Sequence, residues 1–422
     1  MGITRSAITL FAVAVFALAL AACGGGDDGG VKPVGSGTTS GSPYQITEPG
    51  NLTWMAKNVS GSSGRYFELM NDIDLEGKGW APIGSYLNPF RGNFNGGGFK
   101  ISGLHINRPA DNDVGLFGWI DVGEVKDLTV EIASGGVIGL AYVGGIAGGV
   151  DLGGRINNCV VTGNVRGNSI IGGIAGVVGF NGIGSINDSS FTGNVISTAT
   201  EPDEGVGIGG IAGAVGFYNA PSSTGNINRC YAIGNVSGQL GVGGIAGAVG
   251  VDTGATGYVN DCYSTADVIG IDGVGGIAGV GGFDLLGGGS GVGNINRCYA
   301  TGDITGDNGV GGIAGLFVNG GVSNCAALNS VISGSGAGFG RVAGDSGTLS
   351  NNVARSSMTV PGGATSSLNG IHGYSISAGD ISNSATYSDS PPADTGGLGW
   401  NFTSIWKWWD LGPTPEELPL LR

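Results

Sequence analysis

A short glycine-rich phrase, Gly-Gly-Ile-Ala-Gly, recurs along the chain and constrains the fold more than any other feature of the sequence. Its isoleucines are Ile146, Ile174, Ile211, Ile245, Ile277 and Ile313. A second phrase keeps step with it and reads apolar residue, Asn, any residue, small residue. Clear copies begin at residues 156, 186, 227, 259, 295 and 322, and relaxed copies at 101, 125, 349 and 381. Repeats spaced in this way predict a solenoid, in which each unit buries its apolar side against its neighbours.

The segments between the glycines are too short and too glycine-rich for helices, and they suit short strands joined by turns. We therefore predict an all-β fold, a right-handed parallel β-helix solenoid of about ten rungs. Stacked strands lie about 4.8 Å apart, so each repeat position becomes a file of similar residues. Before the repeats, Leu52, Met55, Ala56 and Val59 follow a helical period, which predicts a short N-terminal helical cap.

Two files of the second phrase support this fold. The first is mostly small and uncharged, as an inward column requires: Leu104, Leu128, Cys159, Ser189, Cys230, Cys262, Cys298, Cys325, Asn352 and Ser384. The second fits a turn, where Asn tolerates left-handed backbone and its amide can bond the copy above: Asn157, Asn187, Asn228, Asn260 and Asn296. The paired glycines of the first phrase predict a tight corner, with the isoleucine filling the core.

Five of the six cysteines fall in the inward file. Neighbouring rungs would bring them near disulfide distance, but an odd number cannot pair fully and Ser189 interrupts the file. We predict buried reduced thiols acting as small apolar side chains, with disulfides between rungs as the alternative. One Cys per rung, without a Cys-x-x-Cys motif, predicts no metal site.

The composition narrows the function classes. The 92 glycines follow no Gly-X-Y period, which excludes collagen, and the 41% of hydrophobic residues argues against a disordered linker. The net charge of −15 excludes non-specific binding of nucleic acid, which needs clustered Lys and Arg. The same charge disfavours approach to anionic membranes through basic patches.

The N-terminus reads as an export signal. An apolar run ends in Leu20-Ala21-Ala22-Cys23, which resembles the lipobox of bacterial lipoproteins. That resemblance implies cleavage before Cys23, lipidation of Cys23, and membrane attachment at the bacterial outer membrane or cell surface. An ordinary signal peptide with an accidental Cys is the alternative.

Later residues resemble a repeat family. The phrase "VGGIAG" followed by "INRCYATGDI" is similar to the GLUG-motif repeats of bacterial surface proteins, which include adhesins and non-catalytic repeats of some IgA-specific metallopeptidases. The resemblance covers residues 44–422. It implies four parts: a lipoprotein signal peptide (1–22), a flexible Gly/Ser tether (23–43), a β-helix with its cap (44–390) and a C-terminal capping segment (391–422). The family carries no single activity.

Groups that could perform catalysis are scarce. His105 falls between two apolar strand residues, and His372 lies in "NGIHGYS", which faintly resembles polygalacturonases. Those enzymes also need clustered aspartates, whereas the only Asp-Asp pair here lies in the tether. The chain has no HExxH, P-loop or calcium-binding nonapeptide motif. We therefore predict that the protein is not an enzyme and needs no cofactor or metal.

Two sets of aromatic residues are candidates for ligand binding. Tyr231, Tyr263 and Tyr299 follow the inward Cys, so they should point outward as an exposed ladder. Bracing of adjacent rungs by stacked rings is the alternative. The second set lies in loops of unequal length after the glycine-rich phrase, where specificity usually resides: Phe180, Phe217, Tyr218 and Phe283.

The sequence thus predicts a non-catalytic surface lipoprotein that binds a glycan, or a host or partner surface protein, as adhesins do. Two alternatives stay open: a structural spacer without a specific ligand, and a polysaccharide-active enzyme using Asp residues with His372.

Overall fold

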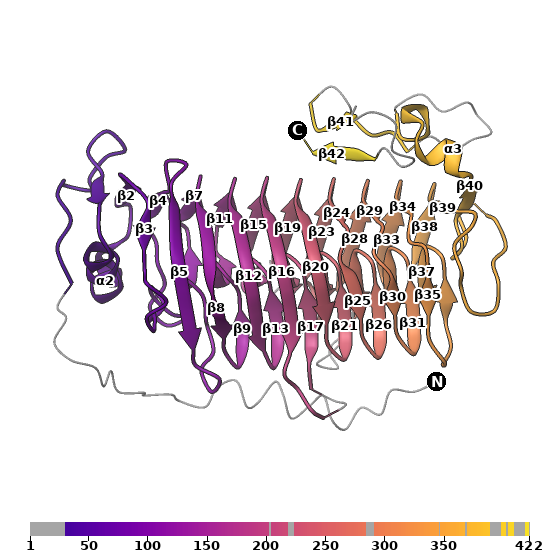
Figure 1. Ribbon diagram of the computed structural model, residues 1–422, viewed down its shortest axis with the longest axis horizontal. Helices are drawn as coiled ribbons and strands as arrows, with labels where there is room; N and C mark the ends of the chain where they lie inside the picture. Colours follow the sequence, from indigo (N-terminus) through magenta and orange to yellow (C-terminus); the bar gives the residue numbers. More distant parts are fainter. Residues whose placement is uncertain are drawn as a thin grey trace.

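Four sheets of stacked, mutually parallel strands run along an elongated rod (Figure 1). The computed structural model describes residues 30–201, 204–217, 223–283, 291–345, 347–367, 369–388, 398–401, 404–408 and 418–421. The expected signal peptide and Cys23 lie outside the described residues. This parallel β-solenoid confirms the predicted fold class, and the eleven strands of its first sheet agree with the predicted number of rungs.

Sheets 1 and 2 contain the longest series of strands. Sheet 1 is built of β1 (Tyr44–Ile46), β2 (Tyr66–Leu69), β4 (Asn93–Asn95), β7 (Glu124–Lys126), β11 (Gly154–Asn157), β15 (Ile183–Asn187), β19 (Thr224–Asn228), β23 (Thr256–Asn260), β28 (Val292–Asn296), β33 (Gly320–Ser323) and β38 (Thr348–Ser350). Sheet 2 is built of β3 (Ile73–Asp74), β5 (Lys100–Asn107), β8 (Thr129–Ile138), β12 (Val160–Gly167), β16 (Ser190–Ser197), β20 (Tyr231–Ser237), β24 (Tyr263–Ser264), β25 (Asp267–Ile269), β29 (Tyr299–Ala300), β30 (Ile304–Thr305), β34 (Ala326–Ala327), β35 (Ile332–Ser333), β39 (Val353–Arg355) and β40 (Tyr374–Ile376).

Sheets 3 and 4 complete the wall of the rod. Sheet 3 is built of β9 (Ala141–Val143), β13 (Ser169–Gly172), β17 (Val206–Gly209), β21 (Leu240–Gly243), β26 (Asp272–Gly275), β31 (Asn308–Gly311) and β36 (Phe339–Gly340). Sheet 4 is built of β6 (Phe117–Asp121), β10 (Ala147–Asp151), β14 (Ala175–Val178), β18 (Ala212–Phe217), β22 (Ala246–Val251), β27 (Ala278–Gly281), β32 (Ala314–Phe317) and β37 (Ala343–Asp345). An antiparallel pair, β41 (Trp406–Trp408) and β42 (Pro419–Leu421), stands apart from them.

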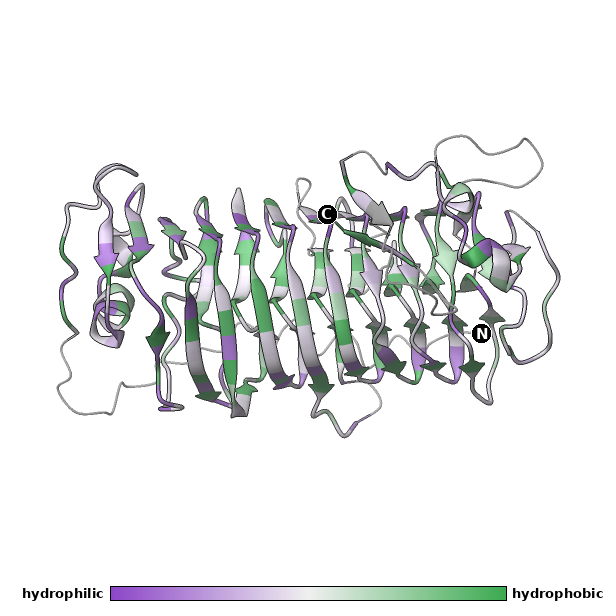
Figure 2. Cartoon of the chain, turned by 45° about the horizontal axis from the view of Figure 1, so that its top comes forward, coloured by the Kyte–Doolittle hydropathy of each residue, from purple (hydrophilic) through white to green (hydrophobic). Residues whose placement is uncertain are grey.

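One rung passes through the four sheets in turn, from β19 through β20, β21 and β22, and returns to sheet 1 at β23. Equivalent residues meet in register, such as Ile227 with Val259. Along the longer strands of sheet 2, such as β5, hydrophobic residues alternate with hydrophilic ones, and Figure 2 shows bands of both colours on strands of the rod. Two relaxed copies of the second phrase were placed wrongly: 101–104 lies in sheet 2, and 381–384 lies in the short helices α3 (Ala378–Ile381) and η3 (Ser384–Thr386).

The repeated glycine-rich phrase forms the corner between sheets 3 and 4, as predicted, and all six of its isoleucines are fully buried. The last glycine of the phrase is required for a further reason, which is lack of space. A Cβ on Gly247, the last glycine of one copy, would fall on the backbone of Gly207 and Ile208 in the preceding rung. Close approach of two backbones, rather than left-handed conformation, therefore requires glycine at this position.

The cysteine file lies inside the rod, and all five described cysteines are buried and unpaired with one another as disulfides. Three of the thiols also form a ladder as acceptors: the backbone N–H of Cys230 points to Sγ of Cys262 at 3.4 Å, that of Cys262 to Sγ of Cys298 at 3.4 Å, and that of Cys298 to Sγ of Cys325 at 3.5 Å. Ser189 accepts the equivalent bond from Cys159 N–H at 3.0 Å. Burial raises the pKa of the Cys159 thiol to about 12, so this thiol stays protonated.

This ladder predicts different effects for two substitutions of Cys262. Cys262→Val leaves the buried N–H of Cys230 without its acceptor, so we expect a loss of about 1–3 kcal/mol in unfolding free energy. Cys262→Ser keeps an acceptor, as Ser189 does, and should lose less. Urea unfolding of both variants measures the difference. Equal losses would show that the N–H needs no partner there.

The Asn file forms a chain of side-chain hydrogen bonds along sheet 1, as predicted. Asn187 donates to Asn157 at 2.8 Å, Asn228 to Asn187 at 2.9 Å, and Asn260 to Asn228 at 3.1 Å. The left-handed backbone conformation that is predicted for Asn157 and its equivalents does not occur at these residues. It falls on the next residue, with φ of 50° to 53° at Asp127, Asn158, Asp188, Arg229, Asp261, Arg297, Asn324 and Asn351.

Charged residues in this left-handed file pair between rungs. Arg229 binds both carboxylate oxygens of Asp188, at 2.5 and 2.7 Å. Arg297 binds Asp261 in the same bidentate way, at 2.7 and 2.8 Å. Four consecutive rungs therefore carry Asp, Arg, Asp and Arg at one turn position, with each Arg bonded to the Asp of the preceding rung.

The N-terminal end of the rod is covered by α2 (Pro49–Lys57) and η2 (Val59–Gly61), which bury Leu52, Met55 and Val59 and confirm the predicted helical cap. Residues 30–43 differ from the flexible tether that their composition predicts. The N–H of Val31 donates to Gly50 O at 2.8 Å, and Tyr66 N–H donates to Gly37 O at 3.0 Å. Because these backbone groups find partners in the cap and in sheet 1, this part of the segment takes a fixed place.

Candidate binding surfaces

The three tyrosines of the predicted ladder do stack on one flank of the rod. The rings of Tyr231 and Tyr263 lie 4.9 Å apart at 4°, and those of Tyr263 and Tyr299 lie 5.0 Å apart at 2°. In-register pairing of β20, β24 and β29 places them at equivalent positions of sheet 2.

The ladder is not exposed, which corrects the expectation. Tyr263 is only 7% exposed and Tyr299 only 1%, although Tyr231 is half-buried. The cover is the C-terminal segment, the described residues between 398 and 421, which lies along the flank of the rod (Figure 1). Trp400 stacks on Tyr299 at 6.1 Å, and the Tyr299 hydroxyl donates to Pro419 O at 2.8 Å.

The same segment was expected to close the end of the rod, but its described part covers a flank instead. Trp400 and Trp406 are fully buried and stack on each other at 4.6 Å. The indole N–H of Trp400 donates to the backbone oxygen of Asn324 at 2.9 Å. Chain-internal bracing, which was the alternative for the tyrosines, therefore accounts for most of the ladder.

The loop aromatics gather at the edge where sheet 4 leads into sheet 1, called here the loop edge. Phe180 packs against Trp119 at 5.7 Å and Tyr142 at 5.8 Å, and it is 8% exposed. Tyr86, from a distant loop, contacts the ring of Phe180 at 5.8 Å and remains 38% exposed. The repeats did not indicate that Tyr86, Trp119 and Tyr142 would join this cluster, because none of the three has an aromatic equivalent at a fixed repeat position.

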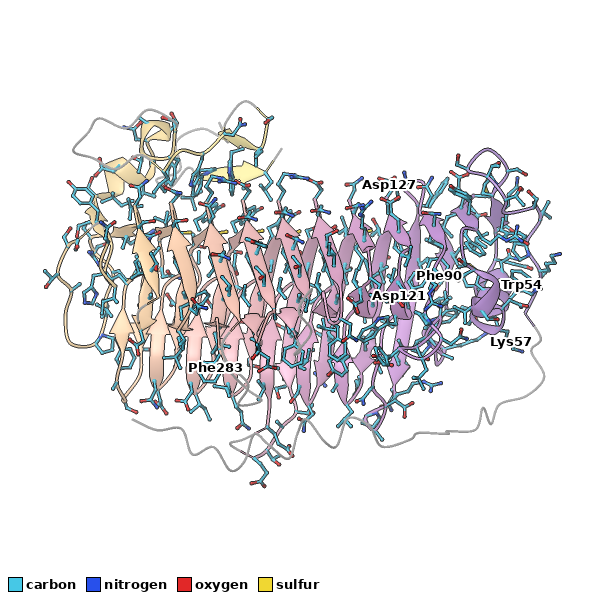
Figure 3. The ribbon with its side chains drawn as sticks, turned by 180° about the vertical axis from the view of Figure 1, so that it is seen from behind. Trp54, Lys57, Phe90, Asp121, Asp127 and Phe283 are labelled. Atoms are coloured by element: carbon cyan, nitrogen blue, oxygen red, sulfur yellow. The ribbon has the colours of Figure 1, made fainter. Side chains whose placement is uncertain are left out.

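The other loop residues extend this surface along the rod. Phe217 is half-buried and stacks on Phe180 at 6.1 Å. Phe283 is also half-buried, and its carbonyl accepts a bond from the N–H of Asp252 at 2.8 Å. Figure 3 shows Phe283 toward the lower edge, away from Asp127 at the upper rim. Tyr218 lies outside the described residues.

A buried carboxylate fixes the first loop of this edge. Asp151 is 1% exposed and accepts backbone bonds from Phe180 at 3.1 Å, Asn181 at 2.9 Å and Gly182 at 2.9 Å. Its register partner in the preceding strand is Asp121, whose N–H donates to Phe90 O at 2.9 Å; Figure 3 shows Asp121 and Phe90 close together. The position of Phe180 thus depends on a buried carboxyl group.

The two carboxylates predict a pH effect on stability. Burial and repulsion by Asp151 raise the pKa of Asp121 from 3.8 to about 6, against an opposing effect of Arg91. Between these two values the folded protein holds a proton that the unfolded chain has released, so this site loses stability as pH rises through that window.

We expect Asp121→Asn to remove this loss. Relative to the wild type, the variant should gain stability when thermal unfolding is measured at about pH 7.5 instead of about pH 4.5. A difference between variant and wild type that stays constant with pH would contradict the assignment.

His372 does not belong to a group suited to catalysis. Its Nδ1 accepts the N–H of Arg341 at 3.4 Å, and burial together with the charge of Arg341 lowers its pKa. The Arg341 side chain also bonds the His372 carbonyl at 3.0 Å. Polysaccharide cleavage usually needs paired carboxylates, whereas this arrangement supplies a cation. In the described part of the chain, no cluster of three His, Cys, Asp or Glu residues could hold a metal ion.

A surface that the sequence did not indicate lies outside sheet 1, near the cap. Side chains from β2, β4 and β7 line a cavity of about 140 Å³ there, with Ser40 and Pro43 beside them. The rungs of β2, β4 and β7 match the repeat poorly in sequence. The sequence alone therefore did not show that their outward residues would align.

Comparisons with known proteins show limited likeness. No family model matches the chain. A stretch of 110 residues is 40% identical to a "Putative Gly-rich membrane protein" of Evansella cellulosilytica, and covers 24% of this chain and 12% of that protein. A stretch of 127 residues is 34% identical to "Halomucin" of Haloquadratum walsbyi, and covers 27% of this chain and 1% of that protein. The chain thus matches only a small part of either relative.

Two solved structures are similar over longer stretches. A "putative immunoglobulin A1 protease" from Bacteroides ovatus has a TM-score of 0.46 and 22% identity, over 92% of this chain and 94% of that chain. An "IgA1 Protease" has a TM-score of 0.37 and 16% identity, over 74% of this chain and 21% of that chain. These comparisons do not establish a family, so the GLUG-type resemblance stays a prediction. Within the described residues, every helix is too short or too polar to span a bilayer.

Proposed function

We propose that this protein is a non-catalytic, lipid-anchored rod at the bacterial cell surface that binds a glycan or a partner surface protein through its loop edge. The observation that carries the proposal is the different exposure of the two aromatic sets. The tyrosine ladder is closed by the chain's own C-terminal segment, whereas Phe217, Phe283 and Tyr86 keep exposed ring surface.

The geometry of the loop edge suits a binding role. Phe217 ends β18, and Phe180 and Phe283 follow the ends of β14 and β27 by two residues, so the sheet 4 strands hold these rings and little conformational entropy would be lost when a ligand orders them. Asp151 holds the first loop through three backbone bonds. Aromatic rings presented on a rigid support are typical anchors of protein and glycan interfaces.

The surface location rests on two supports. One is the lipobox-like run that ends at Cys23, which makes lipidation of this residue the expected anchor. The other is the printed names of the two relatives that match in part, "Putative Gly-rich membrane protein" and "Halomucin". Replacing Cys23 with Ser should release the protein from the membrane fraction of cells that express the full chain.

The binding proposal is tested on a glycan and extracellular-matrix array. The chain from residue 24 onward is compared with a double variant, Phe217→Ser with Phe283→Ser, and with the control Ile269→Ser. Ile269 is an apolar residue on sheet 2 with 52% exposure, so it matches the change in surface hydrophobicity. Binding lost only in the double variant supports the loop edge. If neither the wild-type chain nor its variants bound any glycan or matrix protein on the array, the alternative of a structural spacer would be favoured.

A further inference from the structure

A cavity of about 140 Å³, lined by polar and apolar side chains, lies on the outer face of sheet 1, next to the helical cap. Three adjacent strands each place two side chains around it. These six residues are Tyr66 and Glu68 of β2, Asn93 and Asn95 of β4, and Glu124 and Lys126 of β7.

The strand pattern explains why these side chains face outward. Between each pair lies a core residue, Phe67, Phe94 or Val125, with an exposure of 4%, 1% or 0%. The pairs are in register, so Glu68 meets Asn95 and Asn95 meets Lys126 across the strands. The result is a grid with spacings of about 4.8 Å across the strands and about 6.6 Å along them.

Hydrogen bonds orient the two carboxylates of this grid. Glu68 accepts from the amide of Asn95 at 2.8 Å. Glu124 accepts from the amide of Asn157 at 2.6 Å, and Asn157 in turn accepts from Asn187 at 2.8 Å. The chain of Asn amides therefore ends on Glu124. Each carboxylate has about four acceptor positions, so one amide bond leaves capacity for a ligand.

The segment that was predicted to be part of a flexible tether supplies one wall of the cavity through Ser40 and Pro43. Its turn is closed by backbone bonds from Gly37 to Ser42 at 2.9 Å and from Ser42 to Thr39 at 3.1 Å. The bond from Tyr66 N–H to Gly37 O fixes the turn to the edge of sheet 1. Ser40 and Pro43 thereby stand over the grid as a built wall.

The chemistry of the lining selects a class of ligand. Two carboxylates against one ammonium, that of Lys126, disfavour an anion such as a phosphate. Acceptors and donors alternate at short spacing, which suits a ligand carrying several hydroxyl groups. An enclosed cavity of about 150 Å³ accommodates a benzene ring, and this one is of similar size but open on its outer side, so a six-membered ring can enter with part of its substituents left in solvent. Tyr66 offers a half-buried aromatic surface against which the apolar face of such a ring can lie.

We propose that this cavity binds one pyranose ring of a glycan. The ring hydroxyls donate to Glu68 and Glu124 and accept from Lys126 and the Asn amides. The inference goes beyond the proposed function, because it assigns a site and a ligand class that do not involve the loop edge.

The test is saturation-transfer difference NMR with the chain from residue 24 onward and three separate probes: the methyl pyranosides of glucose, galactose and mannose. At least one should give a signal with millimolar affinity. Glu68→Ala and Lys126→Met should each weaken that binding at least tenfold, because each removes a charged hydrogen-bond partner. Asn228→Ala is the matched control, since Asn228 belongs to the same file of sheet 1 but lies outside the cavity.

Circular dichroism of each variant shows whether the fold is kept. If one of the two cavity variants misfolds, the other still tests the proposal. Absence of signal from all three pyranosides, or binding unchanged in both cavity variants, would overturn the proposal. A Glu68-dependent signal from N-acetyl-lysine amide alone would also overturn it and make the cavity a cation site. The double variant Phe217→Ser with Phe283→Ser should bind the pyranoside normally, so failure of the loop edge and failure of this cavity are distinguishable.

Discussion

Replacing Gly247 with alanine is expected to lower the free energy of unfolding by at least about 3 kcal/mol. The added Cβ would lie well under 3.0 Å from backbone atoms of Gly207 and Ile208. Both belong to the sheet 3 strand of the preceding rung, so neither can move without breaking the stack. Overpacking against backbone is less easily relieved than overpacking against a flexible side chain.

Chemical unfolding followed by circular dichroism measures this loss. The control is Gly61→Ala, because a Cβ on Gly61 would meet no atom within 4 Å. We expect the control to stay within about 0.5 kcal/mol of the wild type. If Gly247→Ala were equally well tolerated, the close approach of sheets 3 and 4 would not be the reason for the last glycine of the repeated phrase.

The second large effect is expected for Trp400→Ala, which should detach the C-terminal segment from the rod. Trp400 is fully buried, stacks on Trp406 and Tyr299, and donates a hydrogen bond to Asn324 O. Truncating a buried Trp typically removes about 3–5 kcal/mol. The segment is a small separate element, so we expect local opening rather than collapse of the rod.

Opening of the segment would uncover Tyr263 and Tyr299. Chemical nitration of tyrosines, mapped by mass spectrometry, should therefore rise at these two residues in Trp400→Ala. Trp54→Ala is the control, because Trp54 belongs to the cap helix α2 at the other end of the rod and packs there against Tyr44, away from the ladder. Protection of Tyr263 and Tyr299 that persists in Trp400→Ala would show that the segment is held by other contacts.

Most of the fold could be predicted because its information is local and repeated. The isoleucine of the glycine-rich phrase, the Cys file and the Asn file each recur at fixed spacing, and stacking turns each into a column. The failures occurred where the repeat weakens. The relaxed copies at 101–104 and 381–384 had too few matching residues to define their register, and pairing with the neighbouring strands decided it instead.

The candidate sites were harder to predict because they depend on contacts between distant segments. The outward direction of Tyr263 followed from strand alternation, but its cover comes from residues more than a hundred positions later, and no period links the two. The cavity beside Tyr66 likewise needs residues 40–43, whose composition suggested a flexible chain. Repetition reveals the scaffold of such a protein, whereas the additions at its two ends follow no repeat.

The paired charges at the left-handed turns have a consequence for assembly. Rungs this similar could stack in a wrong order, with one coil looped out and its neighbours joined directly. Such a skip would place Asp188 against Asp261, or Arg229 against Arg297, and like charges at that separation repel. We therefore expect the alternation of sign to disfavour a fold in which one coil is omitted, because the omission would bring like charges together at the turns.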